Sequence, residues 1–223
     1  MEDASRGRSH VSRGLIRVNI VAYIRAHTAY FVFTVLVYAL GCVFGALAIP
    51  ALTSAERAEL TSYVDVFIRG LARNSPSLAG LDIMRVSLAN HFRIAGLIWM
   101  LGITVIGLPV VIVILFTRGF VAGFSAGFLA AEMGARGMLL ATVAMVPHSL
   151  VLLPATLTLS VASLAFGISL IKQTLAHRKV AFIQDLASYT GLLLLVLVFF
   201  ALASAIEAHI TPVFIRILSA YLV

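Results

Sequence analysis

Long stretches without a charged side chain constrain this chain more than any other feature of its sequence. Residues 29–49 and 94–117 contain no Asp, Glu, Lys or Arg over 21 and 24 positions, and residues 138–171 and 187–206 contain none over 34 and 20. About 20 apolar residues in a helix cross the roughly 30 Å hydrocarbon core of a bilayer. With 61% hydrophobic and 11% charged residues, the chain is too apolar for a water-soluble domain of its size. The sequence therefore predicts an integral membrane protein.

The expected fold is an all-α, polytopic membrane helix bundle with about five transmembrane helices. The predicted spans lie near residues 29–49, 94–117, 119–137, 138–171 and 187–206. The third must extend through Glu132 to cross, because its uncharged part is short. The fourth would be about 51 Å long as one helix, and Pro147 and Pro154 predict that it is broken.

The charge distribution predicts an orientation for these spans. Residues 1–28 carry five arginines and form the expected basic cytoplasmic N-terminus, while residues 29–223 form a single membrane-embedded domain. Five spans also place the basic segment 172–179 in the cytoplasm, as the positive-inside bias favours. The segment 50–93 is then extracytoplasmic, and the C-terminus lies outside.

The segment 50–93 begins with the pattern of a helix start. Thr53 and Glu56 fit a capping box, and Leu60 and Val64 recur at helical spacing. We expect an amphipathic helix that lies on the membrane surface or against the other helices. One interpretation makes its outer side a partner-docking face, and the other makes it a cover for the bundle. The candidate docking residues are Arg57, Arg69 and Arg73.

Small residues at every fourth position form two stripes that predict close helix packing. One stripe lies in the first span and the other in the third, and their members are Gly41, Gly45, Gly119, Gly123, Gly127 and Ala131. Such stripes let two helix backbones approach closely where lipid provides no hydrophobic driving force. The partner is either another helix of the same bundle or a second polypeptide.

A proline-bounded motif holds a histidine within the fourth apolar stretch. Pro147 and Pro154 flank it, and His148 follows the first proline. An ionisable side chain within a membrane segment is a candidate functional residue, and an acid elsewhere in the chain would have to approach it. The alternative is that His148 caps the broken helix. Arg118 is expected to be a cytoplasmic anchor at a span boundary.

No pattern in the sequence indicates catalysis. The chain lacks HExxH, a Walker loop and a GxGxxG motif, and adjacent His148 and Ser149 would point to different faces of a helix. We therefore predict a protein that is not an enzyme, with no catalytic, cofactor-binding or metal-binding residues.

The block between residues 90 and 179 resembles the bacterial stage II sporulation protein M family. The matching features are Asn90, the run from Arg118 to Leu129, Met133-Gly134, the stretch from Val146-Pro147-His148 to Pro154-Ala155, and the basic loop at Lys172. In the broader family the proline block often reads Pro-His-Gly, with a Glu two residues before the second proline. Here those positions are Ser149 and Leu152, which favours the sporulation branch over transporter-like members.

The resemblance implies a function that the residues alone do not. Such a protein acts in endospore formation, in the mother-cell or septal membrane, during engulfment of the forespore. It is a non-enzymatic scaffold that anchors or localises peptidoglycan hydrolases, with the stage II sporulation proteins D and P as partners. The alternative, from the broken span with His148, is a permease or channel-like transport component. A homo-oligomer is compatible with both, and nucleic acid is not an expected partner.

Overall fold

The described part of the chain is helical in every element of the computed structural model. It covers residues 27–73, 76–175 and 182–222, and side chains are described at 27–66, 81–173 and 182–215. The predicted N-terminal region 1–28 lies almost wholly outside these residues, as do the side chains of Arg69 and Arg73. The elements are α2 (Thr28–Leu47), the short 3₁₀ helix η1 (Ile49–Ala51), α3 (Ser54–Arg73), α4 (Pro76–Gly102), α5 (Gly107–Leu175) and α6 (Phe182–Leu222).

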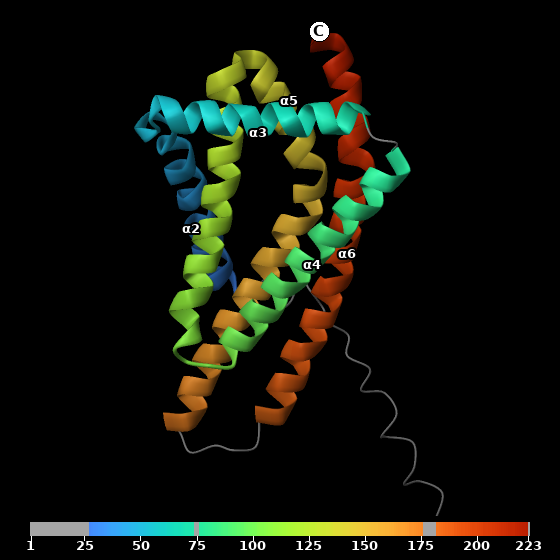
Figure 1. Cartoon of the computed structure of the whole chain (residues 1–223). Helices are drawn as coiled ribbons and strands as arrows, with labels where there is room; N and C mark the ends of the chain where they lie inside the picture. The colour runs from blue at the N-terminus through green and yellow to red at the C-terminus, as the bar shows by residue number, and fades with distance from the viewer. Residues whose placement is uncertain (1–26, 74–75, 176–181, 223) are drawn as a thin grey trace, which may run out of the picture.

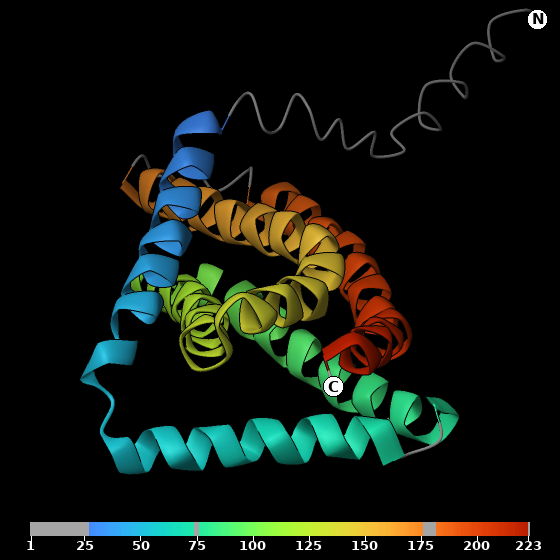
Figure 2. The ribbon, with the colours of Figure 1, turned by 90° about the horizontal axis from the view of Figure 1, so that it is seen from above.

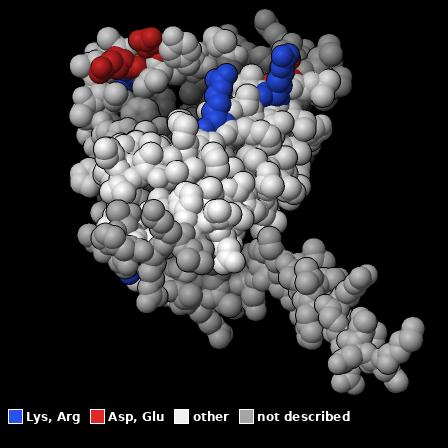
Figure 3. All heavy atoms as spheres, turned by 90° about the horizontal axis from the view of Figure 1, so that it is seen from below, with Lys and Arg blue, Asp and Glu red and all other residues white. Residues whose placement is uncertain are grey.

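Within the described residues, three helices are long and apolar enough to cross a membrane. The suitable segments are Thr28–Ala51, Gly107–Gln173 and Phe182–Ile215. Many large apolar side chains on them face outward, such as Leu36, Leu194 and Val198, which are 56, 61 and 66% exposed. A bilayer is the solvent that suits such a surface. On the face seen in Figure 3, Asp and Glu appear only near the margin of the described atoms. The all-α membrane helix bundle is thus confirmed.

Helix α5 is a hairpin with two arms and not one straight rod. Gly134, at φ 58° and ψ −135°, is its one non-helical residue. Residues with a Cβ rarely adopt this backbone conformation, so glycine permits the reversal. Gly137 follows at a close approach, where a Cβ would overlap the backbone oxygen of Leu129. The arm 107–133 therefore runs to one end of the molecule and the arm 135–175 returns from it (Figure 1).

The predicted span at 94–117 is wrong, because a turn divides it. Helix α4 ends at Gly102 and α5 begins at Gly107. Within the turn, Thr104 Oγ1 donates to the Leu101 carbonyl at 3.0 Å and accepts from the Gly107 amide at 3.1 Å. Val105 and Ile106 are apolar but exposed, at 51 and 83%. An apolar turn inside an apolar run leaves no change in charge for sequence reasoning to detect.

The expected break at the two prolines is also wrong. Helix α5 continues through Pro147 and Pro154, and its chain reversal falls at Gly134. Each proline removes one backbone donor, but the neighbouring turns remain helical. Thr158 Oγ1 donates to the carbonyl of Pro154 itself at 2.7 Å.

The core lies where α4, the second arm of α5 and α6 meet. Ile98, Leu159 and Phe200 are fully buried there. Tyr189 donates its hydroxyl to the carbonyls of Ile98 and Trp99, at 3.1 and 3.2 Å, and so joins α6 to the end of α4. Helix α2 packs against the first arm of α5. Viewed from above, α3 runs along one side of the bundle and not over its middle (Figure 2).

Candidate functional site

The glycine stripes of α2 and α5 face each other within the chain. A Cβ added at Gly41 or Gly45 would overlap the backbone oxygen of Phe116 or Phe120. A Cβ added at Gly119 or Gly123 would in turn overlap that of Tyr38 or Cys42. The two backbones thus touch directly, as small-residue stripes allow. Gly127 meets the side chain of Ile49, while Ala131 is exposed near the end of the arm.

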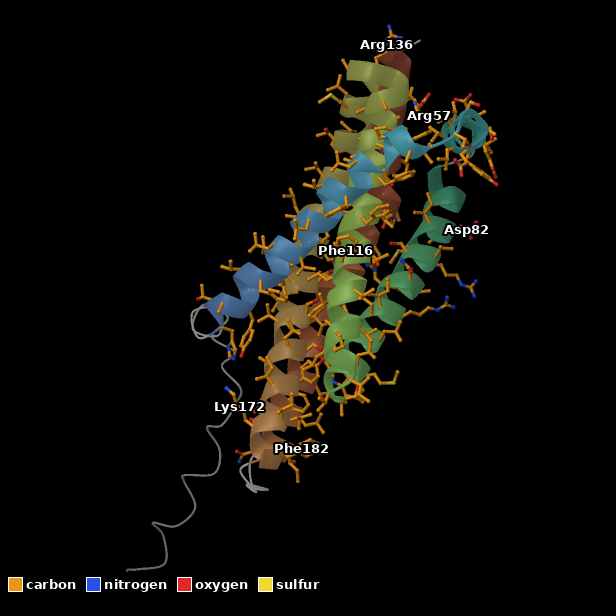
Figure 4. The ribbon with its side chains drawn as sticks, turned by 90° about the vertical axis from the view of Figure 1, so that its left-hand side faces the viewer. Arg57, Asp82, Phe116, Arg136, Lys172 and Phe182 are labelled. Atoms are coloured by element: carbon orange, nitrogen blue, oxygen red, sulfur yellow. The ribbon has the colours of Figure 1, made fainter. Side chains whose placement is uncertain are left out.

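We call this contact, formed by Gly41 and Gly45 of α2 and Gly119 and Gly123 of α5, the glycine seam. It places α2 obliquely across the first arm of α5. Figure 4 shows Phe116 at the crossing, about halfway along the molecule, with Arg136 at one end and Lys172 at the other. The seam fixes the height of the residues just after Phe116. Arg118 therefore lies within the arm near mid-height, and the expectation of an anchor at a span boundary is wrong.

A chain of hydrogen-bonded polar groups joins α4 to α6 inside the bundle. His91 Nδ1 lies 3.0 Å from Ser204 Oγ, and Ser204 Oγ lies 3.3 Å from Ser87 Oγ. Ser87 donates its hydroxyl to a carboxylate oxygen of Glu207 at 2.5 Å. Ser87, His91 and Ser204 are buried. Polar groups in such surroundings are stable only when they bond to one another, as these do.

This order of contacts differs from that of a nucleophilic triad. A triad histidine bonds the serine through one ring nitrogen and the carboxylate through the other. Here both serines approach Nδ1 of His91, and the carboxylate of Glu207 contacts Ser87 instead. In the described part of the chain, no group of three or more His, Cys, Asp and Glu side chains is placed to hold a metal ion.

A cavity with a mostly apolar wall and a few polar side chains lies next to this chain of hydrogen bonds. It measures about 520 Å³ and is lined by residues of α2, α4 and both arms of α5, including His91, Arg118 and His148. Arg118 Nη2 and His148 Nδ1 are buried and have no hydrogen-bond partner among the described residues. Because the helix is unbroken at Pro147, His148 does not cap a helix end.

Glu132, Asp185 and Glu207 are three acids that could approach His148, and they occupy separate positions in the structure. Glu132 pairs with Arg57, and Asp185 accepts from Gln173 Nε2 at 2.7 Å. Only Glu207 belongs to the same region, where it interacts electrostatically with His91 and Arg118.

Sequence reasoning missed Ser87, His91 and Ser204. Spacing offered a signal, because residues 87 and 91 lie one turn apart on α4 and residues 204 and 207 one turn apart on α6. Each pair therefore occupies one helix face. Nothing in the sequence showed that those two faces meet.

Helix α3 is tied to the bundle at its start. Arg57 Nη1 lies 3.3 Å from Glu132 Oε1, and Arg57 Nη2 donates to the Ile49 carbonyl at 3.0 Å. The predicted capping box is present: Glu56 accepts from the amide and hydroxyl of Thr53, both at 2.8 Å. These bonds favour the carboxylate and lower the pKa of Glu56 below its ordinary value.

The inward side of α3 follows the predicted pattern as far as its side chains are described. Leu60 and Val64 line a smaller apolar cavity beneath the helix, with Phe128 of α5. Tyr63 also borders this cavity but is 64% exposed, and Val66, which is not part of its lining, is 69% exposed. An amphipathic helix that leaves apolar side chains exposed has surface available to lipid or to a partner.

Comparison of the chain with models of known protein families gives one match. The family model described as Stage II sporulation protein M matches residues 34–212. No curated protein and no solved structure shows a significant match to the chain.

Proposed function

The chain belongs to the stage II sporulation protein M family, and we propose that it is a membrane scaffold of endospore formation. In this proposal it anchors or localises peptidoglycan hydrolases at the septal membrane while the mother cell engulfs the forespore. The proposed partners are the stage II sporulation proteins D and P. Membership of this family is the observation that supports the proposal. The family is not known as an enzyme family.

The proposed topology has five crossings: α2, α4, the two arms of α5, and α6. Helix α2 begins in the half of the molecule that holds Lys172 and Phe182, and Arg136 and Arg57 lie toward the other end (Figure 4). We propose that the arginines before α2 and the basic segment 172–179 lie on the same side of the membrane, which is the cytoplasmic side by the positive-inside bias. Helix α3 and the turn at Gly134 then lie on the extracytoplasmic side.

The proposed docking surface is the outer side of α3. The helix touches the bundle at few points, and its exposed Tyr63 and Val66 are the kind of apolar anchors that interfaces use. Arg57 is a weaker candidate than its sequence position suggested, because Glu132 and the Ile49 carbonyl already engage its guanidinium. Arg69 and Arg73 remain candidates from the sequence.

Recruitment in sporulating cells tests this surface. The double variant Tyr63→Ser/Val66→Ser removes the exposed apolar anchors, and we expect about a tenfold loss of septal hydrolase signal, since anchor residues each contribute more than about 1 kcal/mol. The measurement is the fluorescence of a tagged hydrolase at the septum, with equal membrane levels of both scaffolds verified by immunoblot. Ser62→Ala, at an exposed position beside Tyr63, is the matched control. Undiminished recruitment after removal of residues 54–73 would show that α3 is not the docking site.

The buried polar groups favour one alternative function, a permease or channel-like component. Intramembrane ionisable residues commonly mark substrate or proton paths, and His91, Arg118, His148 and Glu207 lie in one region of the bundle. The test is flux through proteoliposomes that contain the purified chain. Under this alternative His148→Ala abolishes flux without reducing expression. Equal flux in the variant and the native chain would contradict it.

A further inference from the structure

The cavity beside Arg118 opens toward the outside of the bundle. Three apolar residues of its wall, Leu97, Val113 and Val121, are 45, 60 and 57% exposed. They belong to α4 and the first arm of α5, and Arg118 lies on that same arm near mid-height. In a membrane, this height is where acyl chains lie. The mouth of the cavity therefore faces lipid and not bulk water.

The positive charge beside the cavity has no direct ion-pair partner among the described residues. The Arg118 guanidinium forms no ion pair with any described carboxylate, and its Nη2 is buried without a hydrogen-bond partner. Glu207 interacts with Arg118 electrostatically, but the two form no direct ion pair, and the Glu207 carboxylate accepts the hydroxyl of Ser87 instead. His148 Nδ1 is likewise buried and unpartnered. A buried cation is costly unless an anion or several acceptors surround it, so this wall is suited to an anionic group.

We propose that this cavity binds an anionic phospholipid by its phosphate, which leaves the membrane surface to reach Arg118 inside the bundle. The guanidinium of Arg118 offers a fork of donors that matches a phosphate, and the imidazole of His148 and the amide of Asn90 on the same wall offer further donors. The apolar side chains of the cavity wall pack against the part of an acyl chain that is nearest to the headgroup. A volume of about 520 Å³ lies within the range of sites for ligands much larger than a free phosphate.

Thermal unfolding of the purified full-length chain in a non-ionic detergent tests the site. Phosphatidylglycerol is expected to raise the unfolding midpoint, because a ligand that binds only the folded state stabilises it. Phosphatidylcholine and sodium phosphate at the same concentrations are expected to leave it unchanged. Native mass spectrometry should find one tightly held phosphatidylglycerol per chain.

Arg118→Gln is expected to weaken phosphatidylglycerol binding at least tenfold, because it removes the charge-assisted contacts. The matched control is Arg93→Gln, which removes the same charge from an exposed position of α4 outside the cavity wall and should bind as the native chain does. Leu153→Trp fills the apolar part of the cavity, keeps Arg118, and should also abolish the midpoint shift. If Arg118→Gln fails to fold, the response of Leu153→Trp still tests whether the lipid binds in this cavity.

Three results would overturn the proposal. The first is an equal response of Arg118→Gln and Arg93→Gln, which would place lipid binding on the general surface. The second is an equal midpoint shift with sodium phosphate, which would make the ligand a soluble anion. The third is an unchanged response in Leu153→Trp.

Discussion

The first turn of α3 shows how a single side chain fixes where a helix begins. Glu56 reaches back to the amide and hydroxyl of Thr53, so the amide that precedes the helix has a partner. The next residue, Arg57, joins the same turn to Glu132 beside the reversal of α5. Two adjacent residues thus set both the start of α3 and its attachment to the bundle.

The Thr53–Glu56 cap should depend on pH. The folded pKa of Glu56 lies below its value in an unfolded chain, about 4.3, so the cap is stabilised above that value and weakens as the pH falls through the folded pKa. Hydrogen exchange at the Thr53 amide, corrected for intrinsic rates, should therefore show less protection at pH 3 than at pH 6. In Glu56→Gln the protection should not change with pH. The same pH dependence in that variant would contradict the assignment.

At the scale of elements, the glycine seam between α2 and α5 sets the arrangement of the bundle. Each backbone lies where a Cβ of the other helix would be, so the contact leaves no space for even one methyl group. Gly96 provides a comparison on α4, because a Cβ added there meets nothing within 4 Å. The absence of a side chain at Gly123 thus allows close packing of the two helices, whereas at Gly96 no neighbouring atom requires a glycine.

The same substitution should therefore have opposite effects at these two positions. Gly123→Ala forces the backbones apart and should lower stability by about 1–3 kcal/mol, as overpacking does. Gly96→Ala should raise stability by about 0.4–1 kcal/mol, because it restricts the unfolded chain and strains nothing in the folded one. Thermal unfolding of both variants in detergent measures the difference. A stable Gly123→Ala variant would show that the seam is not close-packed.

For the whole molecule, the proposed topology predicts which residues are accessible from each side. In a Cys42→Ala background, Ser62→Cys on α3 should react with a membrane-impermeant maleimide in intact cells. Gln184→Cys, near the start of α6, should react only after the membrane is permeabilised, because the proposal places that end in the cytoplasm. Both positions are exposed, so burial does not hide either. Reaction of Gln184→Cys in intact cells would contradict five crossings with a cytoplasmic N-terminus.

Uncharged runs predicted the membrane bundle well but missed one of its turns. Charge and length identified the first and last helices, because those signals are properties of the local sequence. The reversal at Gly134 falls within a few residues of the predicted boundary between spans 119–137 and 138–171, where charged residues interrupt the apolar run. The turn at 103–106 is bounded by apolar residues, and only the packed structure shows where it falls. The prolines at 147 and 154 were the more obvious signal, yet the surrounding helix accommodates both.

The candidate site was predictable only in part, because it depends on contacts between distant segments. His148 was found from its apolar neighbours, and the glycines of the α2–α5 seam were found from their spacing. The interaction of Arg118 with Glu207 joins residues 89 positions apart, and that of Ser87 with Glu207 joins residues 120 apart. No local pattern reports such pairs, so the polar region appeared only once the helices were placed.

Co-purification from sporulating cells tests the scaffold proposal most directly. The chain, tagged at its N-terminus, is extracted in mild detergent, and the bound proteins are identified by mass spectrometry. The proposal predicts extracytoplasmic peptidoglycan hydrolases in the bound fraction, and their loss in the Tyr63→Ser/Val66→Ser variant. Recovery of the chain alone, or with an ATPase, would contradict the scaffold and favour transport.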